Sequence, residues 1–315
     1  MSSFADILVT QSTKGSTKLE QIESVLNWKV VDKKLQQLIR RGKMGRPPYP
    51  LLSLFKVLVL QRLYDLSDPQ MEEMLYDRLS FRRFCDFGLS DKLPDETTIC
   101  RFRGVLGNKV EKILEVVLQD LDEQGLSMKG GAIVDAAVIS SKSSRPKGGE
   151  VSETDPEAGW TKKGGQYHHG YKMHTCVDDE HGLIQSLEVT SADVHDSLVF
   201  GQILASDDRS VYADKAYDSQ KNRDLLKRHN IEDRVLYKGR RNHKQPQWQK
   251  ELNKIWNKTR SGVERTFAHL KGQQGLGQAR YFGVEKTKQW AIMNAIAYNL
   301  RRAIRILPPP QLSTG

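Results

Sequence analysis

The chain has 315 residues, 49 Lys and Arg against 39 Asp and Glu, and a net charge of +10. This length suffices for one large or two ordinary domains, and the positive charge favours an anionic partner over a neutral small molecule. Three widely spaced cysteines without a CxxC pair argue against a disulfide framework and a structural zinc site. No apolar run approaches the roughly 20 residues of a membrane span, so we expect an intracellular protein without a membrane partner.

The first 125 residues show mainly the apolar spacing of helices. We predict helices over 22–39 and 51–63, separated by prolines that cannot continue a helix. Pro69 suits the first turn of the next helix, and Asp95 or Thr97 can cap a later one. The residues up to 125 therefore form a helical domain.

From Lys129 the pattern changes to strands and helices. The Ser-, Lys- and Gly-rich stretch 140–170 has no pattern typical of a core, and we expect a mobile loop there. The predicted strands cover 131–139, 171–177, 183–190, 210–214 and 234–237. The predicted helices cover 196–205, 219–229, 259–271 and 288–306. Three early strands followed by alternating helices and strands are typical of an α/β fold.

Three acidic residues stand at conspicuous places in this pattern. Asp135 interrupts an apolar strand, Asp214 ends another strand at a turn, and Glu264 lies on a predicted helix. At about 100° per helical residue, Glu264 shares one stripe of its helix with Arg260 and Lys271. Taken singly, each acid has an ordinary explanation, namely a solvent-facing strand residue, a turn or cap residue, and an ion pair with Arg260.

Arg260, Glu264 and Lys271 have the spacing Arg-x3-Glu-x6-Lys, and further phrases occur in order between about Gly45 and Arg302. They include Gly45-Arg46-Pro47-Pro48-Tyr49, Pro94-Asp95-Glu96-Thr97-Thr98, His169-Gly170-Tyr171-Lys172-Met173-His174 and Asp214-Lys215-Ala216-Tyr217-Asp218. On these residues the chain resembles the DDE transposases of bacterial insertion sequences, of the insertion-sequence-four/five type. It departs from their pattern at Asn257, where a Tyr is expected, and Trp256 stands beside it.

The resemblance implies an RNase H-like catalytic domain with a mixed sheet over 126–307. An all-α domain over 1–125 that binds DNA or dimerises would precede it, and a flexible tail over 308–315 would follow. Asp135, Asp214 and Glu264 would be the catalytic residues and would hold two Mg²⁺ ions, for which Mn²⁺ can substitute. We expect DNA contacts from Arg260, Lys271, Lys172, His174, Lys215 and Arg265. For Lys172 and His174, on one face of a strand, an ordinary strand surface is the alternative.

The positive charge agrees with a DNA partner. Residues 227–305 contain 19 Lys and Arg against 5 Asp and Glu, a local charge of +14. Phosphate binding needs such a local field, although basic residues also solubilise surfaces. We therefore expect a transposase of the bacterial cytoplasm that binds the element ends and target DNA, as a homodimer or larger assembly. The alternatives are a transposase-derived DNA-binding regulator without catalysis, and a nuclease or resolvase without strand transfer.

Overall fold

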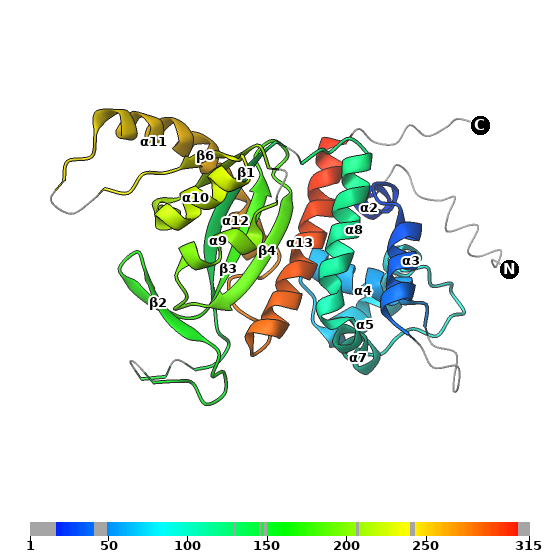
Figure 1. The fold of residues 1–315 in the computed structure, drawn as a ribbon. Coiled ribbons are helices and arrows are strands. Elements are labelled where there is room, and N and C mark those ends of the chain that lie inside the picture. Colours follow the sequence, from blue (N-terminus) through cyan, green and yellow to red (C-terminus); the bar gives the residue numbers. More distant parts are fainter. Residues whose placement is uncertain are drawn as a thin grey trace. The chain divides into compact units, whose positions relative to one another are not determined.

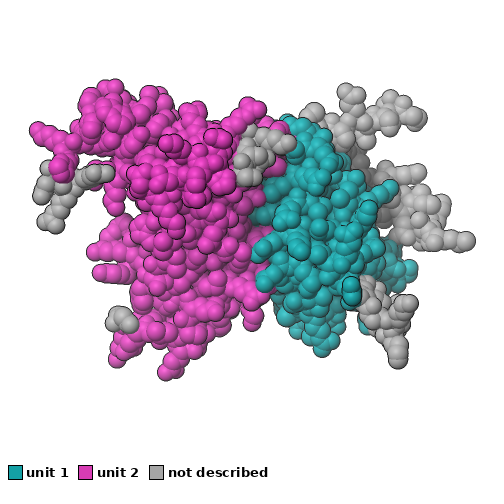
Figure 2. Space-filling model, in the orientation of Figure 1, with its two compact units in different colours: residues 1–125, 293–315 teal, residues 126–292 magenta. Residues whose placement is uncertain are grey.

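The computed structural model describes residues 17–40, 49–128, 130–144, 146–147, 150–205, 208–239 and 243–307. The chain divides into two compact units, one of residues 1–125 with 293–315 and the other of residues 126–292 (Figure 2). The expected tail 308–315, and the Gly45–Pro48 part of the first quoted phrase, lie outside the described residues.

The described part of residues 1–125 is helical, as predicted (Figure 1). Its helices are α2 (Lys18–Ser24), α3 (Trp28–Leu38), α4 (Leu51–Tyr64), α5 (Asp68–Asp77), α6 (Leu79–Phe84), α7 (Glu96–Leu106) and α8 (Val110–Glu123), with a 3-10 turn η1 (Gly107–Lys109). Asp95 caps α7 by accepting a hydrogen bond from the Thr98 N–H at 2.7 Å, as the sequence indicated.

The prediction of a single helix over 22–39 is wrong, because the helix is interrupted between α2 and α3. The carboxylate of Asp120, on α8, accepts a hydrogen bond from the backbone N–H of Asn27 at 2.9 Å. Val25 and Leu26 are buried in the break. A tertiary contact from a helix 93 residues away therefore replaces the local helical bond, which spacing alone does not reveal.

The second unit is built on a six-stranded mixed sheet. Its strands are β1 (Gly131–Ser140), β2 (Gly159–Lys163), β3 (Gln166–Asp178), β4 (Ile184–Ser191), β5 (Ser210–Ala213) and β6 (Glu232–Val235). The strand order is β2-β3-β1-β5-β6, and β4 also pairs with β3. The pairs among β1 to β4 are antiparallel, whereas β5 runs parallel to β1 and β6 parallel to β5. This is the RNase H-like arrangement expected.

Helices and turns complete the second unit. They are η2 (Asp196–Leu198), α9 (Phe200–Ile203), η3 (Lys215–Tyr217), α10 (Gln220–Arg228), α11 (Gln247–Arg260), α12 (Gly262–Gln273) and α13 (Val284–Ile306). The helix α11 was not predicted from the sequence, and the helix predicted from residue 259 begins only at Gly262. The helix α13 belongs to both units, because its residues 293–306 group with the helices of the first unit. From the sequence we expected these residues within the catalytic domain.

The stretch 140–170, expected as a loop without core residues, contains β2 and the start of β3. Its anchor is Asp155, which is fully buried. The Asp155 carboxylate accepts hydrogen bonds from the hydroxyls of Ser141 and Tyr171, and from the backbone N–H of Gly283 at 3.1 Å. The expectation of a mobile loop was wrong, because hydrogen bonds to the buried Asp155 carboxylate order this segment. Such hydrogen bonds cannot be predicted from the spacing of hydrophobic residues.

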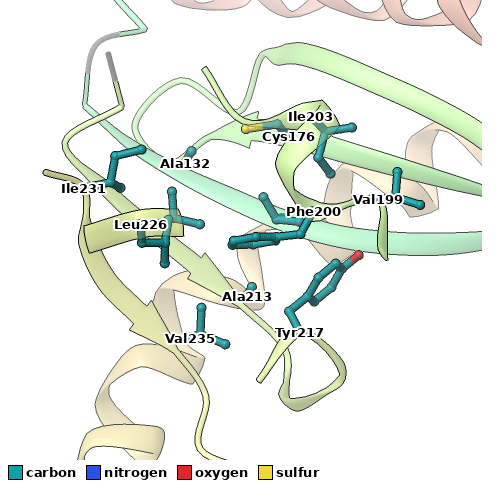
Figure 3. Packing of buried hydrophobic residues seen from close by; sticks show 12 residues of the cluster. Ala132, Cys176, Val199, Phe200, Ile203, Ala213, Tyr217, Leu226, Ile231 and Val235 are labelled. Carbon is teal, nitrogen blue, oxygen red and sulfur yellow. The ribbon is translucent and has the colours of Figure 1, made fainter. Parts of the chain in front are cut away.

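A hydrophobic cluster packs against one face of the strands that precede the two predicted aspartates (Figure 3). It joins residues of β1, β3, β5, β6, α9, α10 and the turn at Tyr217. Phe200 and Tyr217 are fully buried at its centre, with ring centroids 5.5 Å apart. The cluster therefore supports the middle of β1, where Asp135 lies, and the end of β5, which Asp214 follows.

Candidate active site

Asp135 and Asp214 are brought to neighbouring positions by two parallel strands. Val134 of β1 pairs with Ala213, the last residue of β5. The residue that follows each of these two is a predicted catalytic aspartate. Paired residues of adjacent strands lie side by side, so the two aspartates are neighbours. The pKa of Asp135 is raised mainly by burial, and the negative charge of Asp214 adds to this, as expected of two nearby carboxylates.

The Asp135 carboxylate lies in a largely desolvated position, with 21% of its side chain exposed. Burial raises its pKa above the usual value, and the neighbouring Asp214 adds to this effect. The N–H of Ala136, which donates to Oδ1 at 2.7 Å, and the charges of Arg260 and Lys163 act in the opposite direction. A largely desolvated carboxylate with a second carboxylate beside it favours a nearby cation, and Arg260 and Lys163 supply positive charge there.

Arg260, at the end of α11, joins two of the predicted catalytic acids. Its Nη1 donates to Asp135 Oδ2 at 3.2 Å, and its Nη2 donates to Glu264 Oε1 at 3.3 Å. Its Nε donates to Asn257 Oδ1 at 2.9 Å, so the residue at the departure from the family pattern helps to orient the guanidinium. Glu264 lies in the first turn of α12. Arg260 therefore links Glu264 to Asp135.

The three acidic residues are of the type that binds a divalent metal ion, although they do not form a complete set of metal ligands in this structure. Within the described ranges, no group of three or more His, Cys, Asp or Glu side chains is arranged to hold a metal ion. The three carboxylates nevertheless offer the hard oxygen donors that Mg²⁺ and Mn²⁺ prefer. Glu264, with 65% of its side chain exposed, is linked to Asp135 only through Arg260.

Three of the predicted DNA-contacting cations, Lys215, Arg265 and Lys271, are exposed. Lys215 directly follows Asp214, and Arg265 directly follows Glu264. Partial desolvation, together with the charge of Lys163, lowers the pKa of Lys271. These side chains are accessible to a DNA backbone.

Lys172 and His174 are placed differently from the expectation. His174 is fully buried, and Lys172 forms an ion pair with Asp196 at 2.9 Å. The Thr190 hydroxyl donates to the Ser191 carbonyl, so it accepts from the Nε2 of His174 at 3.1 Å. This burial argues against direct DNA contact by either residue. Lys172 and His174 lie on one face of β3, as predicted, but that face is covered at His174.

The buried imidazole of His174 predicts a pH-dependent stability. Desolvation lowers its pKa from 6.5 to about 4; the charge of Asp196 opposes this and that of Lys172 adds to it. Between these two pH values the unfolded chain binds the proton more tightly than the folded chain, so stability falls as pH decreases through this window. The contribution is about 3 kcal/mol, from about 1.4 kcal/mol per pKa unit. Urea unfolding of the wild type should therefore lose more stability between pH 7 and pH 4 than His174→Gln does, and parallel pH curves would contradict this assignment.

Two further residues lie at the site and were not predicted from the sequence. Tyr217 lies fully buried beneath it, and its pKa is raised by burial and by the charges of Asp196, Asp135 and Asp214. Lys163 extends from β2 toward β1, and its charge acts on Asp135. Tyr217 belonged to a phrase that carried the resemblance, whereas Lys163 lay in the presumed loop and offered no signal.

Two family models match this chain. The family model described as "Transposase DDE domain" matches residues 126–300, and a second, "Transposase domain (DUF772)", matches residues 8–104. A solved structure, the cryo-EM structure of the piggyBac transposase synaptic complex with hairpin DNA, has a TM-score of 0.46 and 9% identity. That similarity covers 93% of this chain and 76% of the other. None of the helices in the described residues is long and apolar enough to span a membrane.

Proposed function

We propose that this chain, which belongs to the family of transposase DDE domains, is an insertion-sequence transposase of the four/five type that cleaves and joins DNA at the ends of its element. The observation that carries the proposal is the pairing of Val134 with Ala213, which sets Asp135 and Asp214 side by side within the matched region. The hydrogen bonds of Arg260 to Asp135 and Glu264 support including Glu264 in the proposed site. Two-metal phosphodiester chemistry needs carboxylate ligands of this kind.

In this proposal Asp135, Asp214 and Glu264 hold two divalent ions, Mg²⁺ or Mn²⁺. Such ions would help to deprotonate the attacking water, and later the attacking 3′-OH, and would stabilise the departing 3′ oxygen. Asp135, which neighbours Asp214 and is joined to Glu264 through Arg260, would be one of their ligands. Arg260 orients Asp135 and Glu264 through its two hydrogen bonds, and Lys271, Lys215 and Arg265 bind backbone phosphates.

We assign the DNA-binding steps to two parts of the chain. The basic stretch 227–305, with its local charge of +14, supplies sequence-independent binding. The helical residues 1–125 recognise the terminal inverted repeats or form the dimer. Because two element ends must be held together, at least two copies act at once, in the bacterial cytoplasm where the DNA lies.

The test is a cleavage assay on a duplex that carries one end of the element together with its flanking DNA. We expect a cut at the boundary of the terminal repeat that leaves a 3′-OH, detected by polymerase extension, and joining of that end to a target plasmid. Binding without any cut would instead identify the DNA-binding regulator. Cutting without joined product would identify a nuclease or resolvase.

A further inference from the structure

The hairpin of β2 and β3 has a fixed tip. Gly164 and Gly165 form its two-residue turn, with φ of 58° and 82°, and Lys163 pairs with Gln166 across it. Two successive residues with positive φ are what the hairpin turns that match strand twist require, and glycine adopts them without strain. Lys163 is therefore held at a defined position as the last residue of β2.

Lys162 and Lys163 extend to opposite sides of this hairpin, as successive strand residues do. The Lys162 ammonium lies over the ring of Tyr167, 5.2 Å from the ring centroid. The Lys163 ammonium instead lies 3.4 Å from the backbone carbonyl of Ala136, the residue that follows Asp135 in β1. The hairpin therefore delivers one of its two lysines to the acidic site.

Lys163 is surrounded by a specific set of charges. Burial raises the pKa of Asp135, and the charge of Lys163 opposes this effect. Burial lowers the pKa of Lys271 on α12, and the charge of Lys163 adds to that effect, so Lys163 acts on both groups. Neither lysine forms an ion pair with a carboxylate in the described part of the chain, whereas Arg260 pairs with two. Asp135, the carboxylate on which Lys163 acts, is already paired with Arg260. Two neighbouring ammonium groups repel each other, and an anion bound between them would relieve that repulsion.

We propose that Lys163 and Lys271 together hold one phosphodiester group of the DNA strand at the acidic site, with the β2–β3 hairpin serving as the arm that supplies Lys163. This inference rests on the proposed function, in which Lys271 already contacts phosphate. The inference adds Lys163 of β2 as a second cation beside Lys271 of α12, so that the scissile strand is bound from both elements. Lys163 is a positioning residue, because it acts on the backbone of the DNA rather than on the reacting atoms.

The experiment compares Lys163→Gln with Lys162→Gln, which removes the same charge from the other side of the hairpin. Binding of an element-end duplex is measured by fluorescence anisotropy in EDTA over a range of KCl concentrations, so that no cleavage is needed. Lys163→Gln should weaken binding about tenfold and reduce the slope of log K against log[salt] by about 1 in magnitude. Lys162→Gln should change both less, and Lys163→Arg should restore both.

A double variant separates a shared phosphate from two independent contacts. If both lysines hold one phosphate, adding Lys271→Gln to Lys163→Gln should weaken binding much less than the product of the two single effects. Independent effects, wild-type binding by Lys163→Gln, or failure of Lys163→Arg to restore binding would overturn the inference. In each of those cases cleavage by the wild-type protein would leave the proposed function standing, whereas a wild type that does not cut the duplex would contradict the function itself.

Discussion

Asp135→Asn is expected to reduce cleavage of the element-end duplex by roughly a thousandfold or more while DNA binding in EDTA stays at the wild-type level. The substitution keeps the size of the side chain and its ability to accept from Ala136, but it removes the charge that a metal ion needs. The same result is expected for Asp214→Asn and Glu264→Gln. The measurement is the single-turnover cleavage rate with Mg²⁺, with binding followed separately by anisotropy.

Two controls make this prediction specific to the site. Asp224→Asn on α10 and Glu251→Gln on α11 alter exposed carboxyl groups of the same unit and should leave cleavage unchanged. Residues that act as one unit give non-additive losses, so Asp135→Asn combined with Glu264→Gln should be hardly slower than either variant alone. Losses that multiply, or a comparable loss in the controls, would show that the three acids do not work as one site.

Phe200→Ala is expected to lower the free energy of unfolding of the second unit by about 3–5 kcal/mol, the usual cost of removing a buried aromatic ring. Phe200 is fully buried in the cluster of Figure 3, and its ring lies against Tyr217 beneath the acidic site. The cavity would loosen the support of β1 and β5, so cleavage should fall with stability. Urea unfolding followed by circular dichroism at pH 7 measures the change.

The matched control is Leu198→Ala, two residues earlier in the chain, where 62% of the side chain is exposed. Exposed substitutions of this kind usually change stability by about 0.5 kcal/mol or less. A loss below about 1 kcal/mol for Phe200→Ala would mean that the cluster does not support the site in this way.

Local signals in the sequence predicted much of the fold. The cap at Asp95, Pro69 in the first turn of α5 and the apolar strand over 131–139 depend on neighbouring residues, and the structure confirms them. The family matches confirm the transposase resemblance, while the four/five type stays a prediction. The positions of Asp135 and Asp214 could also be predicted, because each directly follows an apolar strand residue in the sequence. Those two residues, Val134 and Ala213, pair in the structure.

What the sequence could not predict depends on contacts between distant residues. The Arg260–Asp135 ion pair joins positions 125 apart in the chain. The burial of His174 depends on how its strand face is covered, and the order of 140–170 depends on bonds to one carboxylate, Asp155. Neither hydrophobic spacing nor residue type reports such partners, which is why Lys163 went unnoticed in a presumed loop.

The most direct measurement of the central claim follows cleavage of the element-end duplex by the wild-type protein in Mg²⁺, in Mn²⁺ and in EDTA, beside Asp135→Asn. We predict a cut at the repeat boundary with either metal ion, and no cut in EDTA although the duplex stays bound. Asp135→Asn should bind the duplex and leave it intact under all three conditions. Undiminished cleavage in EDTA, or near-normal cleavage by Asp135→Asn, would contradict a divalent-metal site built on Asp135, Asp214 and Glu264.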